Sequence, residues 1–311
     1  MSLRILVTDG MDAGAAAQLR AAGHEVVEQF YPPEALGPAL RDFDAVVIRS
    51  ATKIREPQID AARGGRLKLI LRAGVGTDNI AVPYAEEAGI AVNNTPNASS
   101  NAVAELAMAL LFSCARHLSI AGHTMREQQW EKKAYSKGFE LAGKTMGVIG
   151  YGRIGRLVGA KAQALGMNVL SYVNRRKPEG CECQTMRFVT PDELFARSDI
   201  LVLCAPAAGK PLVREETLAQ MKDGVVIINV SRGGNVDEAA LLEALDSGKV
   251  RSAGLDVWAD EKAPNWRLAA HPHVSCTPHI GAGTAEAQRR IGQELVELIT
   301  QFAVEHGANS R

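Results

Sequence analysis

The sequence has few features that would build a disulfide framework, a metal site or a membrane span. Only five of its 311 residues are cysteines, and the single close pair, Cys181 and Cys183, has one residue between them. That spacing differs from the C-x2-C pattern of common zinc and redox sites. The longest apolar run is too short to cross a bilayer, and the first residues read as a short strand without the apolar core of a signal peptide. We therefore expect a cytoplasmic protein with no bound metal.

An excess of one charge is also missing. The chain has 35 Lys+Arg and 35 Asp+Glu, and its formal net charge is +0. Proteins that bind nucleic acids or membrane surfaces usually carry a basic excess or a basic face. Hydrophobic residues make up 46% of the chain and aromatic residues 5%, as in ordinary globular proteins. We expect small-molecule partners, with no nucleic acid and no membrane.

Short apolar strands alternate with helical stretches along almost the whole chain, and the length suggests two domains. Most strands are continuous runs of Val, Ile and Leu, which indicates parallel strands buried on both faces. The predicted strands lie near 3–8, 44–48, 68–71, 90–93, 145–149, 168–172, 200–204, 225–230, 252–256 and 274–276. The predicted helices lie near 12–22, 33–41, 57–63, 82–88, 101–129, 153–164, 191–197, 215–221, 237–247 and 284–303. This pattern predicts an α/β fold with two doubly wound parallel-sheet domains.

A glycine-rich turn connects a predicted strand to a predicted helix in the second half of the chain. Gly150, Gly152 and Gly155 have the G-x-G-x-x-G spacing, and the strand–turn–helix context is the one that dinucleotide binding requires. Gly150 would permit the tight turn, Gly152 would let the backbone approach a pyrophosphate, and Gly155 would let the helix pack closely. The N–H groups at the start of the helix would face the phosphates. The segment therefore predicts a dinucleotide cofactor.

The next strand lacks the acidic residue that usually binds the ribose 2′-hydroxyl of NAD. Val173 stands near the expected position, followed by Asn174, Arg175 and Arg176, and no carboxylate appears before Glu179. Guanidinium groups can hold a 2′-phosphate with two parallel hydrogen bonds. This favours NADP as the cofactor; the alternative is a solvated basic loop in an NAD-dependent protein.

Three polar residues follow successive predicted strand ends in the same half of the chain: Arg232, Glu261 and His279. Ligands of doubly wound sheets bind beyond the carboxyl ends of the strands, so we expect these side chains to converge on one crevice. An arginine can bind a carboxylate, a histidine can carry a proton near neutral pH, and a carboxylate can orient the histidine. Each residue alone is weak evidence, but the three beside a dinucleotide loop indicate an oxidoreductase site.

The order of these motifs resembles that of the D-2-hydroxyacid dehydrogenase family over nearly the whole chain. The motifs are Gly150-x-Gly152-x-x-Gly155, Ser231-Arg232-Gly233-Gly234, Leu255-Asp256-Val257-Trp258-x-x-Glu261 and Pro278-His279-Ile280-Gly281. In the remaining parts, residues 47–53, 72–79, 94–97 and 130–133 resemble the 3-phosphoglycerate dehydrogenase branch. The resemblance implies a flavodoxin-like substrate domain, 1–98 plus 285–311, and a Rossmann NAD(P)-binding domain, 99–284. It also implies a homodimer formed through the cofactor domain.

The resemblance implies hydride transfer between the cofactor and a small anionic D-2-hydroxy or 2-oxo acid. Arg232 would bind the substrate carboxylate, His279 would exchange the hydroxyl proton, and Glu261 would hold His279 and stabilise its protonated form. Its cofactor-binding positions fall on Val75, Gly150, Gly152, Arg153, Ile154, Gly155, Asn174, Arg175, Arg176, Ala205, Val230, Ser231, Asp256, His279 and Gly281. Its substrate-binding positions fall on Arg49, Arg72, Ala73, Gly74, Arg232 and Lys132. Among these, Arg49 and Arg72 would hold a substrate phosphate.

Some features depart from the family pattern. The strand end Leu203-Cys204-Ala205-Pro206 lacks the usual His-Thr before the proline, and because the sequence stops at Arg311 we expect a short form without appended regulatory domains. The leading hypothesis is an enzyme like 3-phosphoglycerate dehydrogenase. An NADPH-dependent glyoxylate or hydroxypyruvate reductase is the alternative, favoured by the two arginines after Asn174. A non-catalytic dinucleotide-sensing corepressor is a third reading, which the presence of all three catalytic-type residues disfavours.

Overall fold

Two parallel β-sheets organise the chain, and each belongs to its own unit. The computed structural model describes residues 1–172, 180, 183–207 and 209–308. Met1–Ser99 and Ala282–Arg311 form the first unit, and Ser100–Gly281 form the second. Every strand pairing within both sheets is parallel. The predicted α/β class with two doubly wound sheets is therefore confirmed.

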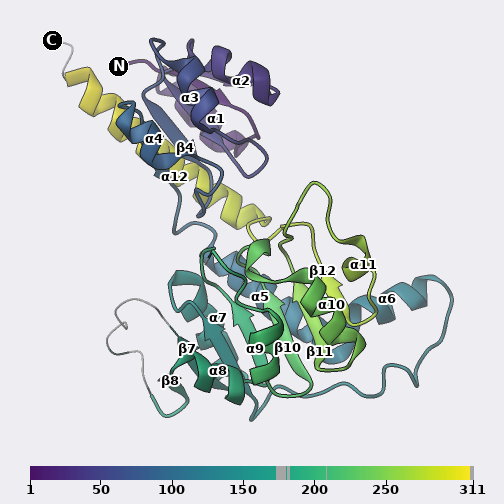
Figure 1. Cartoon of the computed structure of the whole chain (residues 1–311). Helices are drawn as coiled ribbons and strands as arrows, with labels where there is room; N and C mark the ends of the chain where they lie inside the picture. Colours follow the sequence, from purple (N-terminus) through teal and green to yellow (C-terminus); the bar gives the residue numbers. More distant parts are fainter. Residues whose placement is uncertain (173–179, 181–182, 208, 309–311) are drawn as a thin grey trace. The chain divides into compact units, whose positions relative to one another are not determined.

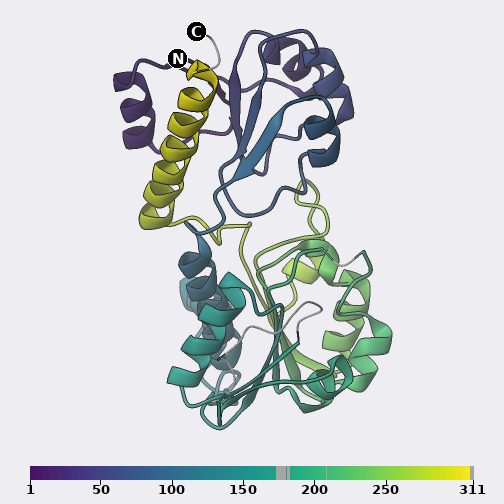
Figure 2. The same cartoon turned by 90° about the vertical axis from the view of Figure 1, so that its left-hand side faces the viewer.

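The first unit has a five-stranded sheet in the order β2-β1-β3-β4-β5. Its strands are β1 Arg4–Val7, β2 Glu25–Glu28, β3 Ala45–Ile48, β4 Leu69–Arg72 and β5 Ala91–Asn94. Its helices are α1 Ala13–Ala21, α2 Pro33–Leu40, α3 Glu56–Ala62, α4 Val82–Glu87 and α12 Ala285–Ala308. Helices α1 and α12 cover one face of this sheet and α2, α3 and α4 cover the other (Figure 2). The last helix thus supplies core residues such as Leu295 and Ile299 to the first unit.

The second unit has a seven-stranded sheet in the order β12-β11-β10-β9-β6-β7-β8. Its strands are β6 Thr145–Ile149, β7 Asn168–Tyr172, β8 Met186–Phe188, β9 Ile200–Leu203, β10 Val225–Asn229, β11 Val250–Leu255 and β12 Val274–Cys276. Its helices are α5 Ser100–Arg116, α6 Leu118–Arg126, α7 Arg153–Ala164, α8 Pro191–Arg197, α9 Glu215–Gln220, α10 Glu238–Asp246 and α11 Trp266–Ala269. Helices α5 and α7 pack on one face, and α8, α9 and α10 pack on the other (Figure 1).

The predicted single helix over 101–129 is wrong, because the segment forms two helices. His117 has a φ of 57°, a left-handed conformation that ends α5, and α6 starts at the next residue with a bend of 67°. No proline or glycine marks the break, so the sequence carried no signal for it. Helix α5 buries ten side chains, whereas α6 buries none and extends away from the sheet (Figure 1). Within the described part of the chain no single helix is long and apolar enough to cross a membrane. Only the bent pair α5 and α6, taken together, has the length and composition of a membrane span.

Two short strands and one short α-helix were absent from the sequence prediction. Strands β2 and β8 lie at the edges of their sheets, and α11 has four residues. In β2, Val26 and Val27 stand between two glutamates, and the three residues of β8 include Arg187. Edge strands need no continuous apolar run because only one side is paired and their faces are partly solvated. Apolar runs alone therefore do not reveal them.

Candidate active site

The glycine turn after β6 packs against protein atoms at Gly150 and Gly155, and it has free space beside Gly152. Gly150 has a φ of 93°, and a Cβ atom there would lie 2.8 Å from the backbone nitrogen of Ala205. A Cβ on Gly155 would lie 2.1 Å from the carbonyl oxygen of Gly150, so α7 packs directly on the turn. At Gly152, which caps α7, nothing lies within 4 Å of the Cβ position. The open side therefore faces the helix N-terminus.

This arrangement fits the pyrophosphate of a dinucleotide. The first N–H groups of a helix have no partner within the helix, and they attract anions. Helix α7 has 12 residues and starts at Arg153, whose side chain is exposed, while Ile154 packs against the core of this unit. The residues present thus supply the backbone surface that a bound cofactor phosphate needs.

The loop after β10 carries Arg232, and its conformation depends on Asn229. The side-chain oxygen of Asn229 accepts hydrogen bonds from the backbone N–H and the hydroxyl of Ser231, at 3.1 and 2.8 Å. Its amide nitrogen donates to the carbonyl oxygen of Arg232 at 2.9 Å. Arg232 is partly buried, and its guanidinium donates to the carbonyl oxygen of Ser231 at 2.7 Å. Asn229, which sequence reasoning did not select, therefore positions the loop; a polar residue at the end of a buried apolar strand was its only signal.

Asn235 connects this loop to the strand end of β9. Its amide nitrogen donates to the carbonyl oxygen of Ala205 at 3.1 Å and to the hydroxyl of Ser231 at 3.0 Å. Two residues expected to bind the cofactor are thus held by one buried side chain, while Val230 is buried in the core. Sequence reasoning also missed Asn235, because its partners are distant in the chain.

Gly233 allows the Arg232 loop to approach the segment after β11. A Cβ atom on Gly233 would lie 1.9 Å from the backbone carbon and oxygen of Trp258. The indole nitrogen of Trp258 donates to the carbonyl oxygen of Thr277 at 3.2 Å. Three strand-end loops are therefore in contact, as expected for adjacent parallel strands.

Asp256, at the end of β11, organises the loop that carries the candidate histidine. Its side chain is almost fully buried, at 1% exposure. One carboxylate oxygen accepts from the hydroxyl of Thr277 at 2.6 Å and from the N–H of Ile280 at 2.8 Å; the other accepts from the N–H of Gly281 at 3.0 Å. Burial raises the pKa of Asp256 above its ordinary value, although these hydrogen bonds act in the opposite direction. This carboxylate, at one of the expected cofactor-binding positions, thus also fixes the backbone of the loop.

His279 and Glu261 come together on the surface of the second unit. The Nδ1 atom of His279 lies 2.6 Å from Oε1 of Glu261. His279 has a φ of 53°, and its N–H donates to the carbonyl oxygen of Asp256 at 2.8 Å. The two side chains are 34% and 44% exposed. Because a carboxylate only accepts hydrogen bonds, Nδ1 carries the proton in the neutral ring and Nε2 is the nitrogen available for proton exchange.

The predicted phosphate-binding arginines follow neighbouring strands of the first unit. Arg72 is the last residue of β4 and pairs in register with Ile48, which precedes Arg49. The backbone N–H of Arg49 donates to Asp9 at 2.7 Å, and its carbonyl oxygen accepts from Asn79 at 2.7 Å. These contacts hold both strand ends at one edge of the first sheet.

Each of these arginine side chains donates a hydrogen bond to a neutral oxygen. The Arg49 guanidinium donates to the side-chain oxygen of Gln288 on α12, and Arg72 donates to the carbonyl oxygen of the buried Ala73. The Arg72 guanidinium lies so close to Gly74 that a Cβ there would be 2.1 Å from it. Val75 is exposed.

The remaining predicted site residues have no described contact with the residues above. Lys132 is exposed on the segment between α6 and β6, and its side chain forms no hydrogen bond or ion pair with another residue that the structure describes. Asn174, Arg175 and Arg176 lie outside the described residues, as does Val173. Among the described residues, no group of three or more His, Cys, Asp or Glu side chains could hold a metal ion.

The glycine turn, the sheet order and the strand-end loops define an α/β protein that binds a dinucleotide. The model of the family D-isomer specific 2-hydroxyacid dehydrogenase, NAD binding domain, matches residues 108–281. The chain is 45% identical over 302 residues to hydroxypyruvate reductase of Thermotoga maritima, covering 95% of this chain and 97% of that protein. The chain belongs to the family of D-isomer-specific 2-hydroxyacid dehydrogenases, which are NAD-dependent oxidoreductases.

Two further comparisons describe its relatives. The chain is 41% identical over 300 residues to D-3-phosphoglycerate dehydrogenase of Methanocaldococcus jannaschii, covering 96% of this chain and 57% of that protein. It therefore spans little more than half the length of this relative. The crystal structure of a glyoxylate reductase from Paecilomyes thermophila is similar with a TM-score of 0.87 and 33% identity, covering 98% of this chain and 96% of that one.

Proposed function

We propose that this protein reduces hydroxypyruvate, transferring a hydride between a nicotinamide cofactor and C2 of the 2-oxo acid. The observation that carries the reaction type is the 2.6 Å contact between His279 and Glu261, on the strand ends that also carry Arg232. Hydroxypyruvate is favoured as the substrate because the match to the Thermotoga maritima reductase extends over 97% of that protein.

Each residue of this set has a role that its chemistry supports. The Arg232 guanidinium would bind the substrate carboxylate with two hydrogen bonds and polarise the neighbouring 2-oxo group. Nε2 of His279 would donate a proton to the 2-oxo oxygen during reduction and take it back during oxidation. The Glu261 carboxylate would stabilise the imidazolium and keep Nδ1 protonated. A bound nicotinamide supplies the hydride, and the turn from Gly150 to Gly155 would hold its pyrophosphate.

The phosphorylated analogue 3-phosphohydroxypyruvate is a second candidate substrate. Arg49 and Arg72 stand at the ends of two paired strands, and arginine is well suited to bind phosphate. The partner of the Arg49 guanidinium is the neutral amide of Gln288, which leaves the positive charge uncompensated by that contact. The identity of 41% to a D-3-phosphoglycerate dehydrogenase supports the same reading.

A panel of assays separates these substrates. Initial rates would be measured with hydroxypyruvate, glyoxylate and 3-phosphohydroxypyruvate, each with NADH and with NADPH. The proposal expects the highest kcat/KM for hydroxypyruvate; a clear preference for 3-phosphohydroxypyruvate that is lost in Arg49→Gln would replace it with the second candidate. No turnover of any 2-oxo acid would refute both.

We propose NADP as the preferred cofactor, on the basis of Arg175 and Arg176 in the sequence. Replacing both with alanine should raise KM for NADPH much more than KM for NADH, because only NADPH carries the 2′-phosphate. Equal increases would remove the two arginines from this role.

We also propose a homodimer formed through the segment around 101–140. Helix α6 buries no side chain, and Leu118 and Met125 are 56% and 55% exposed. Exposed apolar side chains on an extended helix are typical of a surface that a second copy covers. Light scattering should give twice the mass of the chain, and Leu118→Ser with Met125→Ser should lower it; an unchanged mass would reject this surface.

A further inference from the structure

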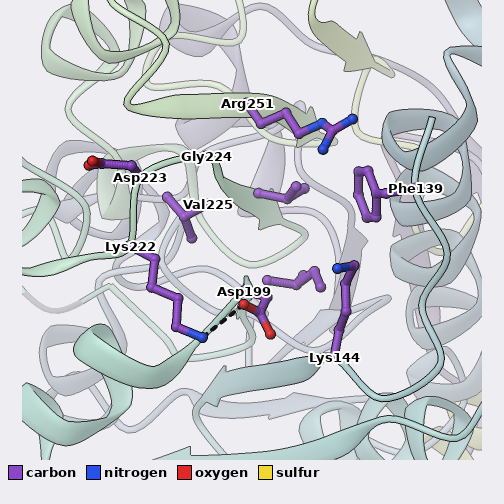
Figure 3. Close-up of a pocket in the computed structure, with 10 residues that line it drawn as sticks. Phe139, Lys144, Asp199, Lys222, Asp223, Gly224, Val225 and Arg251 are labelled. Atoms are coloured by element: carbon purple, nitrogen blue, oxygen red, sulfur yellow. Dashed lines mark hydrogen bonds and ion pairs between the residues drawn. The ribbon is translucent and has the colours of Figure 1, made fainter. Parts of the chain in front are cut away.

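A pocket lies at the edge of the seven-stranded sheet where its strands begin. It has a volume of about 230 Å³. Its polar and aromatic wall consists of Phe139, Lys144, Asp199, Lys222, Asp223 and Arg251 (Figure 3). Lys144 precedes β6, Asp199 precedes β9, and Arg251 is the second residue of β11. In a parallel sheet the strands all start at one edge, so this pocket lies opposite the loops that carry Arg232 and His279.

Both carboxylates of the pocket are already neutralised by lysines. One oxygen of Asp199 accepts from Nζ of Lys222 and the other from the N–H of Thr145, both at 2.8 Å. Asp223 accepts from Nζ of Lys249 at 2.8 Å and points away from Phe139 (Figure 3). These two pairs contribute no net charge to the pocket.

Two further cations flank the ring of Phe139. The guanidinium carbon of Arg251 lies 4.7 Å from the ring centroid, and Nζ of Lys144 lies 5.7 Å from it. Figure 3 shows both side chains directed toward the ring. Arg251 also donates to the carbonyl oxygen of Lys137, and neither cation forms an ion pair with any carboxylate that the structure describes. With Asp199 paired to Lys222 and Asp223 paired to Lys249, the pocket keeps a net positive charge from Arg251 and Lys144, although Lys144 also interacts electrostatically with Asp199.

We propose that this pocket binds a small oxyanion with two negative charges, of which inorganic phosphate is the simplest. An arginine can bind such an anion through two parallel hydrogen bonds, and a lysine adds a compact point charge. The two charges of the anion match those of Arg251 and Lys144. The volume is below the range of about 300–1,000 Å³ that drug-sized ligands occupy, so it suits an anion with few atoms.

Binding here would connect the segment before β6 to the sheet. The N–H of Phe139 donates to the carbonyl oxygen of Ala115 at the end of α5, at 3.0 Å. An anion held by Lys144 and Arg251 would thus join the end of α5, the segment from Lys137 to Lys144, and β11. Because a ligand that binds only the folded state stabilises it, phosphate should raise the thermal stability of this unit.

The test is calorimetric titration of inorganic phosphate into the purified protein at constant ionic strength, with NADPH saturating. Wild type should show a saturable phosphate site. Arg251→Gln and Lys144→Gln should each weaken that site by about tenfold or more, the loss expected for one charge-assisted hydrogen bond. Arg267→Gln is the matched control, because Arg267 is an exposed arginine of the same unit that pairs with Asp246 outside the pocket.

Because other arginines also attract phosphate, the assignment depends on the variants at this edge. Arg251→Lys keeps the charge but loses the two-pronged geometry, so its affinity should lie between those of wild type and Arg251→Gln. Melting curves without phosphate would verify that each variant is folded. Absence of saturable binding in wild type, or equal affinity in wild type, Arg251→Gln and Lys144→Gln, would overturn the proposal.

Discussion

Nδ1 of His279 lies 2.6 Å from Oε1 of Glu261, although the two residues belong to loops that follow different strands. The N–H of His279 is bound to Asp256, and Ile280 and Gly281 are bound to the same residue, so the backbone under the imidazole is fixed on both sides. The imidazole is thus oriented by one carboxylate while its backbone is held by another.

Loss of either member of the pair should reduce turnover, by different amounts. His279→Asn removes the proton donor and should lower kcat by about 10²–10⁴-fold, the usual contribution of a general acid–base group. Glu261→Gln keeps a hydrogen-bond acceptor but removes the charge that stabilises the imidazolium. Its effect on kcat should be smaller, and the pH profile of kcat/KM should shift. Cofactor binding measured by fluorescence should persist in both; near-normal turnover of His279→Asn would exclude the proposed role.

Alanine substitutions at the neighbouring residues Gly233 and Gly234 should have different effects. A Cβ at Gly233 would overlap the backbone of Trp258, whereas nothing lies within 4 Å of the Cβ position at Gly234. Gly233→Ala should therefore lower the free energy of unfolding by about 1–3 kcal/mol, as overpacking does, and reduce kcat by displacing Arg232. Gly234→Ala serves as the control and should change neither quantity appreciably. Denaturant titration followed by circular dichroism checks this; equal stability of the two variants would contradict the close approach of the loops.

The sequence predicted the elements whose apolar runs are continuous. Strands β6 and β7 and helices α7 and α8 have the predicted bounds, because a buried parallel strand has no polar position to interrupt it and Gly152 marks the start of α7. The break at His117 was not predictable, since no proline or glycine marks it and a histidine is found both inside helices and in the left-handed conformation. Edge strand β2 was missed because its two valines stand between glutamates.

Within the candidate site, the sequence predicted which residues follow strand ends but not how they are held. Arg232, Asp256 and His279 all lie just beyond β10, β11 and β12, where parallel topology brings loops together. The hydrogen bonds of Asn229 and Asn235 depend on the exact approach of those loops. Such tertiary contacts leave no periodic pattern in a single sequence, so packing alone reveals them.

Asp256→Asn should disturb the loop that carries His279. An amide presents only one accepting oxygen, while the buried carboxylate accepts three hydrogen bonds from this loop. At least one buried N–H donor would face the amide NH2 group, which should cost about 1–3 kcal/mol in unfolding free energy. We expect kcat to fall as well, because the imidazole loses its fixed position.

A single hydrogen bond to Asp256 can be removed as a comparison. Thr277→Val deletes only the hydroxyl that donates to the carboxylate, and should cost about 0.5–1.5 kcal/mol. Kinetics and denaturant titration of both variants test whether Asp256→Asn is the more harmful substitution. If Asp256→Asn were no more harmful than Thr277→Val, the two backbone N–H contacts would not be what holds the loop.

The first unit should become less stable in mild acid because of His24. This side chain is 8% exposed, and Nδ1 accepts the N–H of Leu3 at 3.2 Å. Burial, and then the nearby N-terminal amine, lower the pKa of His24 below 6.5. The folded state thus binds fewer protons, so stability is unaffected well above pH 6.5 and falls as the pH drops from there through the folded pKa. Denaturation midpoints would be measured between pH 7.5 and about pH 5. They should fall less in His24→Asn, whose side chain accepts the hydrogen bond but does not titrate, than in wild type or in the control His123→Asn on exposed α6. Equal dependence of the midpoint on pH in all three proteins would reject the assignment.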